Sequence, residues 1–576
     1  MVNHSEHKVR KINTYLSRMF DKENIPFGLS SYCSLIFIFL LETLIFVAAV
    51  KSNVADIYPR FNDQIQYLSD SYLVYEKYLN EGLLAGLWYG IREPAAQGIT
   101  HRFFALIAFM LFGASRLSAL LVNLFAFMLW QAITFSTMRK TNFTINVAWI
   151  SMALLLCLQY SWLNVPGSAL DFRLDHLAMC FMGISIMAAV KSDGFLSRKW
   201  SILFGLAVGI TILTRFLTAV YFLGIALFLI LVYLRSQSSH DRIKNILIAM
   251  VVAFVLIAPI FLHNYILIYN YYVVGHLTGV ESDIRASGKG FLESLAFVIN
   301  GVIGFESISF WFILLLIPFI GYVVFGRKLI NNLGGLGFIH QDVKENWQAL
   351  GLTFFIVPLL MLALHKQVSP AVLGILVPGI FVLVMSFLAP LIAFFERCTV
   401  YLQARRYLVI FLVGISFSLG FFNYTYLLLY SSSSREFISD SMKLNLIVDD
   451  IYERLVKSGI KEPTIASDRV TDFLDAQIFR VIIYERKKVW LPLVMTLPTG
   501  IFKENDQFLM ERLYKSDLVF VTDSSNVEGS YPYDEQMQNL YPKLLLYCEE
   551  NMVKLGRYHF FDRDITLYAR PSLALD

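Results

Sequence analysis

The sequence predicts a polytopic α-helical membrane protein of about eleven spans, followed by a C-terminal soluble α/β domain. Of the 576 residues, 57% are hydrophobic and 16% are charged, whereas an ordinary soluble domain has roughly 45–50% apolar and about 25% charged residues. Apolar runs long enough to cross about 30 Å of hydrocarbon recur throughout residues 1–430. The charge density then rises, because residues 1–430 hold 51 charged residues and the much shorter stretch 431–576 holds 41.

Most of the predicted spans are long apolar runs, and one is a shorter run at 200–213. This shorter run ends at Thr214 and Arg215, and the next run begins at once, so residues 200–234 are expected to form a tight helical hairpin. The long runs lie at 31–50, 115–137, 143–160, 174–190, 216–234, 245–267, 309–326, 349–365, 370–396 and 406–430.

Lysine and arginine residues gather on alternate connections between these runs, beginning with the N-terminal segment. Because positive residues stay on the cytoplasmic side of a membrane, we expect a cytoplasmic N-terminus. An odd number of spans then places residues 431–576 outside. In the first outer loop, 51–114, the segment Phe61–Gly82 has helical apolar spacing and Arg102–Phe112 is apolar but too short to span. Both are expected to form helices along the membrane surface.

The predicted boundary between the transmembrane domain, 1–430, and the extracytoplasmic α/β domain, 431–576, falls at a run of serines. Behind it the pattern predicts helices at 440–458, 470–485, 504–515 and 534–550, and strands at Thr464–Ala466, Val489–Leu493 and Leu518–Thr522. The last two β-rich runs, Tyr558–Phe561 and Ile565–Ala569, form either a β-hairpin or two sheet edges. This alternation is typical of a small α/β domain.

Acidic residues near the outer ends of the apolar runs are the candidate catalytic groups, because ionisable side chains are costly beside lipid unless they have partners. Asp171 and Asp175 are four residues apart, so we expect both on one helical face. There they repel each other unless a metal or a cation, either Arg173 or Arg215, lies between them. The alternative interpretation is that the pair complements the helix dipole and anchors the topology.

Asp63 is the second acidic candidate and lies in the first outer loop. A carboxylate at this place is able to take the proton from an acceptor hydroxyl as the hydroxyl attacks a sugar carbon. The alternative is that Asp63 belongs to the solvated face of a surface helix. The functional interpretation gains from the second acidic cluster, which faces the same side of the membrane.

The order of these motifs resembles that of a known enzyme class. A first span is followed by a long outer loop with an early Asp, then by Gly98–Phe104 and Leu111–Leu117, and then by the acidic start of the fourth span. This order is similar to that of the multi-spanning GT-C glycosyltransferases, which include protein O-mannosyltransferases and lipid A aminoarabinose transferases. The resemblance covers roughly residues 30–270, and the outer α/β tail fits the general layout.

The resemblance implies an inverting sugar transfer from a polyprenyl-phosphate donor. In that class the early loop Asp acts as general base or orients the acceptor, and Asp63 matches this position. Asp171 or Asp175 matches the second acidic position. The sequence departs from the pattern at Gln64, where a Glu often follows the early Asp, and at His101-Arg102-Phe103, which replaces a proline-leucine element. A Trp-Trp-Asp signature, typical of oligosaccharyltransferases, is absent from the sequence.

A lipid-phosphate donor needs cations at headgroup depth beside an apolar groove. The candidates for binding the donor phosphate share a position on the predicted outer face: Arg173, Arg215, Arg102, His101 and Arg60. Such cations also stabilise the phosphate as it leaves. For Arg215 the competing interpretation is that the side chain reaches the lipid headgroups.

The function favoured by the sequence is therefore an inverting glycosyltransferase, with a glycan, lipid or protein as acceptor and membrane lipids as surroundings. Two alternatives are a transporter or flippase of lipid-linked envelope precursors and a non-catalytic envelope assembly subunit. The first requires charge deep in the bundle and repeated halves. Glu42 is the main internal carboxylate, and the sequence shows no repeat.

The sequence also bears on the cofactor, the partners and the membrane in which the protein lies. No cofactor is certain from the sequence, and a divalent metal is left open. The net charge of +4 gives no reason to expect a nucleic acid partner. Glycosylation triplets begin at Asn3, Asn142 and Asn423, and none falls in the predicted outer segments. We therefore expect a bacterial inner membrane rather than an endoplasmic reticulum membrane.

Overall fold

The computed structural model of the protein describes residues 29–59, 62–140, 145–275, 290–303, 337–364, 370–398, 402–430, 433–467, 476–495, 505–522, 532–560 and 563–574. The chain divides into two compact units, Met1–Ala48 and Ala49–Asp576. In the first unit the structure describes most of the apolar helix α2 (Leu29–Asn53). The further elements described below belong to the second unit.

Seven helical stretches in the described part of the chain are long and apolar enough to cross a membrane. Besides α2 they belong to α6 (Arg116–Lys140), α9 (Leu174–Lys191), α12 (Ser239–Tyr269, continued by a π-helix over Asn270–Gly275), α17 (Gly337–Leu364), α18 (Val377–Cys398) and α19 (Leu402–Tyr430). Shorter apolar helices accompany them: α5 (Thr100–Phe112), α7 (Ile145–Leu156), α11 (Thr218–Tyr233) and α14 (Phe291–Ile303). The predicted fold class, a polytopic helical membrane protein, is confirmed. The predicted span 309–326 lies outside the described residues.

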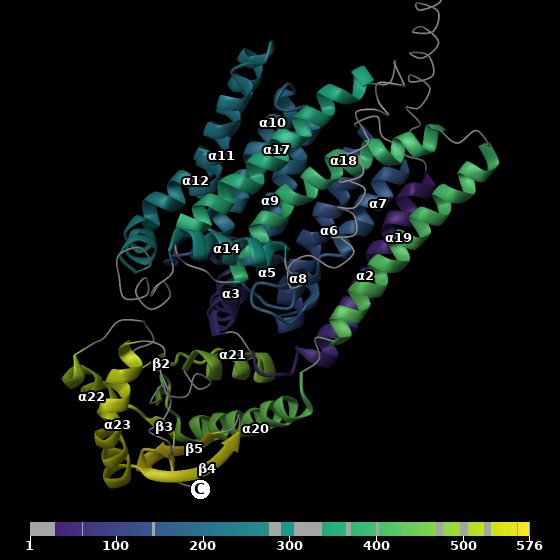
Figure 1. Ribbon diagram of the computed structural model, residues 1–576. Coiled ribbons are helices and arrows are strands. Elements are labelled where there is room, and N and C mark those ends of the chain that lie inside the picture. The colour runs from purple at the N-terminus through teal and green to yellow at the C-terminus, as the bar shows by residue number, and fades with distance from the viewer. Residues whose placement is uncertain are drawn as a thin grey trace, which may run out of the picture. The chain divides into compact units, whose positions relative to one another are not determined.

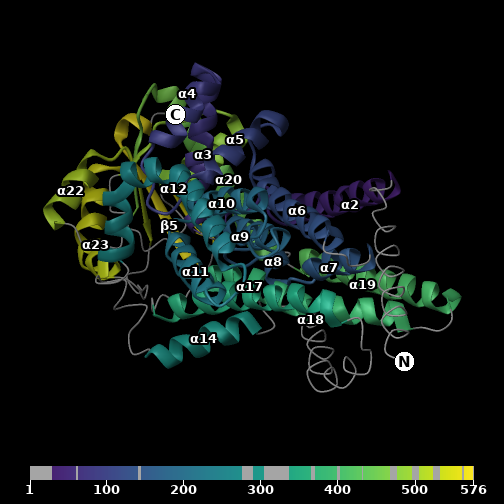
Figure 2. The ribbon, with the colours of Figure 1, turned by 90° about the horizontal axis from the view of Figure 1, so that it is seen from above.

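Helix α9 is the most enclosed of these helices, with 94% of its candidate span buried inside the protein. It packs against α6, α10 (Arg198–Thr214), α17 and α18. Only 22% of the candidate span in α12 is buried, as expected for a helix whose apolar surface faces lipid. Helices α10 and α12 run side by side in both views of the molecule (Figures 1 and 2). The first turn of α9 is therefore surrounded by protein.

Helices α10 and α11 form the hairpin predicted at 200–234, with Arg215 in the short connection between them. The predicted span 143–160 is interrupted, because α7 ends at Leu156 and a separate short helix, α8, follows at Gln159–Trp162. The indole nitrogen of Trp162 donates a hydrogen bond to the carbonyl of Leu156 and fixes this break.

The segment 51–114, predicted to be the first outer loop, contains three helices after α2 in its described part. Helix α3 (Asn62–Glu81) and helix α5 confirm the two helices predicted there. A third, α4 (Leu83–Arg92), follows α3 directly. The break between α3 and α4 lies at Gly82, whose φ of 91° is readily adopted only by glycine. Helix α3 packs against α4 and α5 and forms the outer layer that carries Asp63.

The tail contains a five-stranded sheet of order β2-β1-β3-β5-β4. Strand β1 (Thr464–Ser467) pairs in parallel with β2 (Val494–Met495) and β3 (Leu518–Thr522), whereas β5 (Arg563–Ala569) is antiparallel to β3 and to β4 (Val553–Phe560). The last two β-rich runs thus form a hairpin, in which β4 is the edge. Helices α20 (Arg435–Ser458), α21 (Ala476–Lys487), α22 (Asp506–Lys515) and α23 (Pro532–Asn551) complete the tail, as Figure 1 shows.

Alternate residues of β3 face two different helix layers. Val519 and Val521 pack in one apolar cluster with residues of α22 and α23. The ring of Phe520, between them, stacks on Phe479 of α21 with 4.9 Å between centroids. This period of two is the pattern of a strand that is covered on both faces, and it positions α21 on one side of the sheet.

The strand predicted at Val489–Leu493 is wrong. The side chain of Arg480 donates hydrogen bonds to the carbonyls of Leu491 and Leu493, at the place where sheet partners would be needed. Pairing with β1 begins only at Val494. Because the Arg480 side chain occupies these backbone acceptors, residues 489–493 do not form a strand in spite of their local β propensity.

Candidate active site

The N-terminus of α9 carries the acidic motif, but the two aspartates do not lie on one helical face as predicted. Helix α9 starts at Leu174, and Arg173 is its N-cap residue with extended backbone (φ −107°, ψ 167°). Asp175 belongs to the first turn, whereas Asp171 lies in the preceding loop. The loop is held because the Gly167 amide donates to Asp171 Oδ2 at 2.8 Å and the Asn123 side chain donates to the Asp171 carbonyl at 3.0 Å.

Arg173 brings the three candidate aspartates together. Its Nη2 contacts Asp63 Oδ2 of α3. Its Nε lies 3.8 Å from Asp171 Oδ2 and 3.9 Å from Asp175 Oδ2. On the other side, Arg215 Nη1 lies 2.5 Å from Asp175 Oδ1. We refer to Asp63, Asp171, Arg173, Asp175 and Arg215 as the aspartate–arginine cluster.

The side chains of the cluster differ in their exposure to solvent. The Asp63 side chain is 47% exposed, that of Arg173 is 19% and that of Arg215 is 15%. The side chains of Asp175 and Asp171 are 4% and 0% exposed. The cluster therefore has an open edge, formed by Asp63, and a closed base, formed by Asp171. A substrate that comes from solvent meets the Asp63 carboxylate first.

The charges in the cluster are close to balance. Burial raises the pKa of Asp171 well above its ordinary value, and the repulsion by Asp175 acts in the same direction, against the hydrogen bond from the Gly167 amide. The raised pKa favours the protonated form of Asp171, whereas Asp63 and Asp175 each pair with a guanidinium group. The two arginines are thus the groups available to meet an additional negative charge.

Residues 97–99, which precede α5, hydrogen-bond to the connection between α10 and α11 and position Arg215. We call this segment the strap. The amide of Ile99 donates to the Leu213 carbonyl at 2.8 Å, and the amide of Phe216 donates to the Gln97 carbonyl at 2.7 Å. These two hydrogen bonds lie on either side of Arg215. A Cβ on Gly98 would be 2.0 Å from the Thr214 carbonyl oxygen, so only glycine permits this approach. Sequence reasoning missed the strap, for which the glycine is the sole local signal.

Tyrosines surround the guanidinium of Arg215. Arg215 interacts electrostatically with Asp175 and with Tyr272, Tyr67 and Tyr271. The Tyr67 hydroxyl donates to Gln97 Oε1 at 2.7 Å, which links α3 to the strap. Burial raises the pKa of Tyr67 well above its ordinary value, so its phenol stays protonated. These tyrosines come from segments that are far apart from Arg215 in the chain, so no local sequence pattern indicates the interaction.

Two further phosphate-binding candidates, Arg102 and His101, do not join the cluster. Arg102 is 2% exposed. Its Nη2 lies 2.8 Å from Asp70 Oδ2, and its terminal nitrogens also donate to the carbonyls of Gly90, Glu93 and Pro94. The guanidinium therefore closes the turn between α4 and α5. The terminal nitrogens of Arg102 are thus committed to Asp70 and to backbone carbonyls, and its predicted phosphate contact stays a prediction.

His101 is also buried, and its ring meets the edge of the Tyr67 ring at 4.9 Å between centroids. Burial lowers the pKa of His101 well below its ordinary value. A neutral imidazole brings no positive charge for a phosphate. Arg60 lies outside the described residues. Among the described residues, no group of three or more His, Cys, Asp or Glu side chains is arranged to hold a metal ion.

Solved structures share this arrangement of helices over nearly the whole chain. The crystal structure of ArnT, an aminoarabinose transferase, from Cupriavidus metallidurans in the apo state matches with a TM-score of 0.58 and 11% sequence identity, over 95% of this chain and 100% of that chain. ArnT bound to undecaprenyl phosphate matches with a TM-score of 0.55 and 11% identity, over the same shares of the two chains. Archaeal oligosaccharyltransferase AglB from Archaeoglobus fulgidus has a TM-score of 0.48 at 10% identity, over 95% of this chain and 75% of that chain.

The chain has the GT-C fold, as the resemblance in the sequence predicted. Comparisons of the sequence with family models and with curated proteins give no match. At 11% identity the structural likeness establishes the fold, and the chemistry has to be argued from the residues of the cluster.

Proposed function

We propose that the protein is an inverting glycosyltransferase that moves a sugar from a polyprenyl-phosphate donor to a hydroxyl-bearing acceptor at the outer membrane–water interface. The observation that carries this proposal is the convergence of Asp63, Arg173, Asp175 and Arg215, from three separate parts of the chain, at the start of α9. A solvent-facing carboxylate beside two guanidinium groups is the combination that this reaction needs.

In the proposed reaction Asp63 is the general base. Its carboxylate accepts the proton of the acceptor hydroxyl as the hydroxyl oxygen forms a bond to the anomeric carbon. The bond between that carbon and the phosphate oxygen breaks, and its electron pair leaves with the polyprenyl phosphate. Attack from the face opposite the phosphate inverts the anomeric centre. The 47% exposure of the Asp63 side chain leaves room for an acceptor at its open edge.

Arg215 and Arg173 are the proposed phosphate ligands. Both are held by carboxylates, which fix the guanidinium groups before the donor arrives. Fixed donors stabilise the charge that develops on the leaving phosphate without having to reorganise during the reaction. Asp175 is then a positioning residue for Arg215, and the Arg173–Asp63 contact gives way when the phosphate and the acceptor bind.

The surroundings of the cluster suit a lipid-linked donor. Ile99, Phe216, Ile260 and Tyr272 belong to one apolar group. Phe216 follows Arg215 in the chain, and Tyr272 interacts with it electrostatically. A phosphate at the cluster would thus have its sugar near tyrosines and its lipid chain near apolar helix surface. ArnT, which has this fold, has been crystallised bound to undecaprenyl phosphate.

We further propose that the N-terminus is cytoplasmic, that the tail is extracytoplasmic and that the membrane is a bacterial inner membrane.

The test is a transfer assay with the purified full-length protein in detergent and a panel of polyprenyl-phosphate sugars, with mass spectrometry of the lipid and of the acceptor. We expect one donor to be converted to free polyprenyl phosphate with covalent transfer of its sugar. A parallel assay in vesicles measures translocation of the same lipids. Translocation without covalent transfer would instead support the flippase alternative and overturn the proposal.

A further inference from the structure

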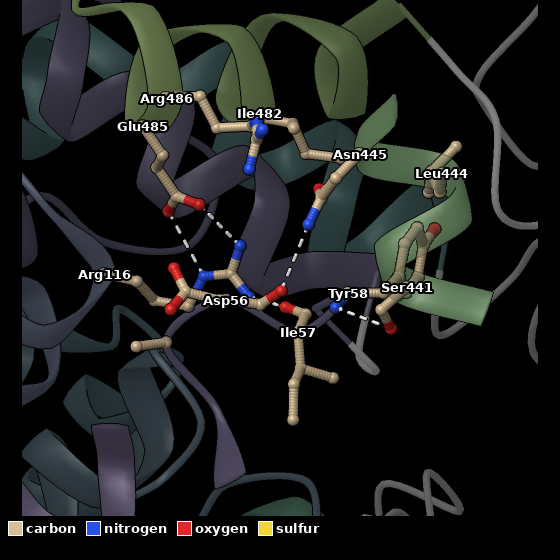
Figure 3. Close-up of a pocket in the computed structure, with 11 residues that line it drawn as sticks. Asp56, Ile57, Tyr58, Arg116, Ser441, Leu444, Asn445, Ile482, Glu485 and Arg486 are labelled. Carbon is tan, nitrogen blue, oxygen red and sulfur yellow. Dashed lines mark hydrogen bonds and ion pairs between the residues drawn. The ribbon is translucent and has the colours of Figure 1, made fainter. Parts of the chain in front are cut away.

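A small polar pocket of about 40 Å³ lies at the junction between the tail and the segment that follows α2. Its walls come from residues 55–58, from Arg116 at the start of α6 and from helices α20 and α21 (Figure 3). None of the residues that line it belongs to the aspartate–arginine cluster. The segment 54–58 precedes Asp63 in the chain by a few residues. Contacts that fix this segment therefore also restrict the position of Asp63, the proposed base.

A buried ion pair joins the tail to this segment. Arg116 Nη2 lies 2.6 Å from Glu485 Oε2 of α21, and their side chains are 3% and 13% exposed. Arg116 Nη1 donates to the carbonyls of Val54 and Ile57. Figure 3 shows the guanidinium between Glu485 and the backbone of this segment. A buried arginine needs its partner carboxylate, so Glu485 and the segment are held as one unit.

Side chains of helix α20 also hydrogen-bond to the backbone of this segment. The Ser441 hydroxyl accepts a hydrogen bond from the Tyr58 amide at 3.1 Å, and the Asn445 side chain donates to the Asp56 carbonyl at 3.2 Å. Both bonds are drawn in Figure 3. The amides of Val54, Ala55 and Ile57 donate to backbone carbonyls nearby. Side chains of α6 and of the tail supply the remaining partners, which are donors to three carbonyls and an acceptor for the Tyr58 amide.

The tail also holds the chain after Asp63. On α3, the Tyr72 hydroxyl donates to Glu485 Oε1 at 2.9 Å, and Glu76 Oε1 accepts from the Tyr484 hydroxyl at 2.6 Å. The rings of Tyr72 and Tyr484 are 4.7 Å apart between centroids. Tyr72 follows Asp63 by nine residues on one uninterrupted helix, which is about 14 Å along its axis.

We propose that the tail brackets Asp63, with Glu485 and Tyr484 as positioning residues for the base. The tail fixes the chain before Asp63 through Arg116 and α20, and it fixes α3 after Asp63 through Tyr72 and Glu76. The carboxylate is thereby held at the open edge of the cluster. The arginines that would bind phosphate start from α9 and the α10–α11 hairpin, whose contacts with the tail are not part of this bracket. Only the catalytic consequence of this inference rests on the proposed function.

If the tail positions Asp63 in this way, loosening these contacts should lower kcat but not the affinity for the lipid phosphate. Loosening the bracket misplaces the base without changing Arg215 or Asp175, and misplacement by about 1 Å costs as much as 100-fold in rate. We therefore expect kcat to fall by about 10- to 100-fold while the affinity for undecaprenyl phosphate stays within about twofold. A role in folding alone would lower the amount of folded protein and leave kcat per folded molecule as in the wild type.

The test uses the full-length double variant Tyr72→Phe, Tyr484→Phe, which removes both α3–tail hydroxyl bonds and leaves the Arg116–Glu485 ion pair in place. The matched control is Tyr541→Phe, which removes a hydroxyl bond to the Thr522 carbonyl within the tail. Three quantities are measured: kcat per folded protein, affinity for undecaprenyl phosphate, and hydrogen–deuterium exchange of the amides in 62–70.

The expected result is faster exchange at 62–70 and lower kcat in the double variant, with neither change in Tyr541→Phe. Unchanged exchange at 62–70 in the double variant would overturn the bracket, whatever the enzyme does. Faster exchange together with wild-type kcat would overturn the positioning role of the tail. If wild-type protein transfers no sugar, the proposed function fails, and the exchange measurement still decides whether the bracket exists.

Discussion

Arg215 Nη1 lies 2.5 Å from Asp175 Oδ1, although 40 residues of the chain separate them. This ion pair links the tip of the α10–α11 hairpin to the first turn of the buried helix α9. It holds a guanidinium at the wall of the bundle beside an apolar group of side chains. This pair is the centre of the proposed phosphate site.

Arg215→Lys should weaken the binding of undecaprenyl phosphate by about tenfold or more, because a charge-assisted hydrogen bond contributes about 1.5–3 kcal/mol and an ammonium group does not reproduce the planar guanidinium. Binding is measured on the purified variant by displacement of a labelled lipid phosphate. Arg198→Lys, at the opposite end of α10 and exposed, is the matched control. Equal affinities of both variants would remove Arg215 from the phosphate site.

Gly98→Ala should displace the hairpin tip and lower both lipid-phosphate affinity and transfer, each by about tenfold, because overpacking of this kind costs about 1–3 kcal/mol. The added Cβ would meet the Thr214 carbonyl at 2.0 Å, and backbone cannot move aside as a side chain does. Gly414→Ala provides the comparison, since a Cβ at Gly414 meets no atom within 4 Å. A Gly98→Ala protein that binds like Gly414→Ala would show that the strap does not position Arg215.

Asp171→Asn should preserve transfer and change the pH dependence of stability. Burial raises the pKa of Asp171 in the folded protein, so the folded state binds its proton more tightly than the unfolded state, whose Asp pKa is about 3.9. Stability from this group is complete below that value and is lost as pH rises toward the folded pKa, at up to about 1.4 kcal/mol per pH unit.

The measurement is the free energy of unfolding of wild type and Asp171→Asn between pH 5 and pH 8, in the same detergent. We expect the wild type to lose stability relative to the variant as pH rises over this range. Asp175→Asn serves as the contrasting variant, because it breaks the pair with Arg215 and should lower transfer. Parallel pH profiles for wild type and Asp171→Asn would show that Asp171 is ionised in the folded protein.

Chelation should leave transfer intact. Arg173 already occupies the space among the three aspartate side chains, with its Nε within 3.9 Å of Asp171 and Asp175 and its Nη2 on Asp63. A guanidinium in that position repels a divalent cation. The assay compares initial transfer rates in EDTA and after addition of Mg²⁺ or Mn²⁺. Loss of activity in EDTA and its recovery with either metal would contradict this expectation.

The outer helices and the membrane helices were largely predictable, because their apolar periodicity is a local property. Helix α3 begins and ends within one residue of the predicted Phe61–Gly82 segment, and strand β3 matches its predicted range. Asp171, Asp175 and Arg215 were identified by their position at apolar helix ends, and Asp63 by its position in the first predicted outer loop. The structure brings them together, and their catalytic roles stay predictions.

The parts that could not be predicted depend on partners far away in the chain. Nothing near Arg102 indicates that Asp70 pairs with it, and nothing near Glu485 indicates Arg116, 369 residues earlier. The expectation that Asp171 and Asp175 share one helical face was wrong, because Asp171 is tied to the Gly167 amide and so remains in the loop before α9. One sequence shows where charges are, and the fold decides which of them are neutralised by internal partners.

The most direct measurement is sugar transfer by Asp63→Asn at saturating polyprenyl-phosphate donor, on protein whose folding and lipid-phosphate affinity match the wild type. Asparagine keeps the size of the side chain and cannot accept the acceptor's proton. We expect kcat to fall by about 100- to 10,000-fold, the usual contribution of a general base, with donor affinity retained. Transfer by Asp63→Asn at the wild-type rate would show that Asp63 is not the base and that the reaction centre lies elsewhere.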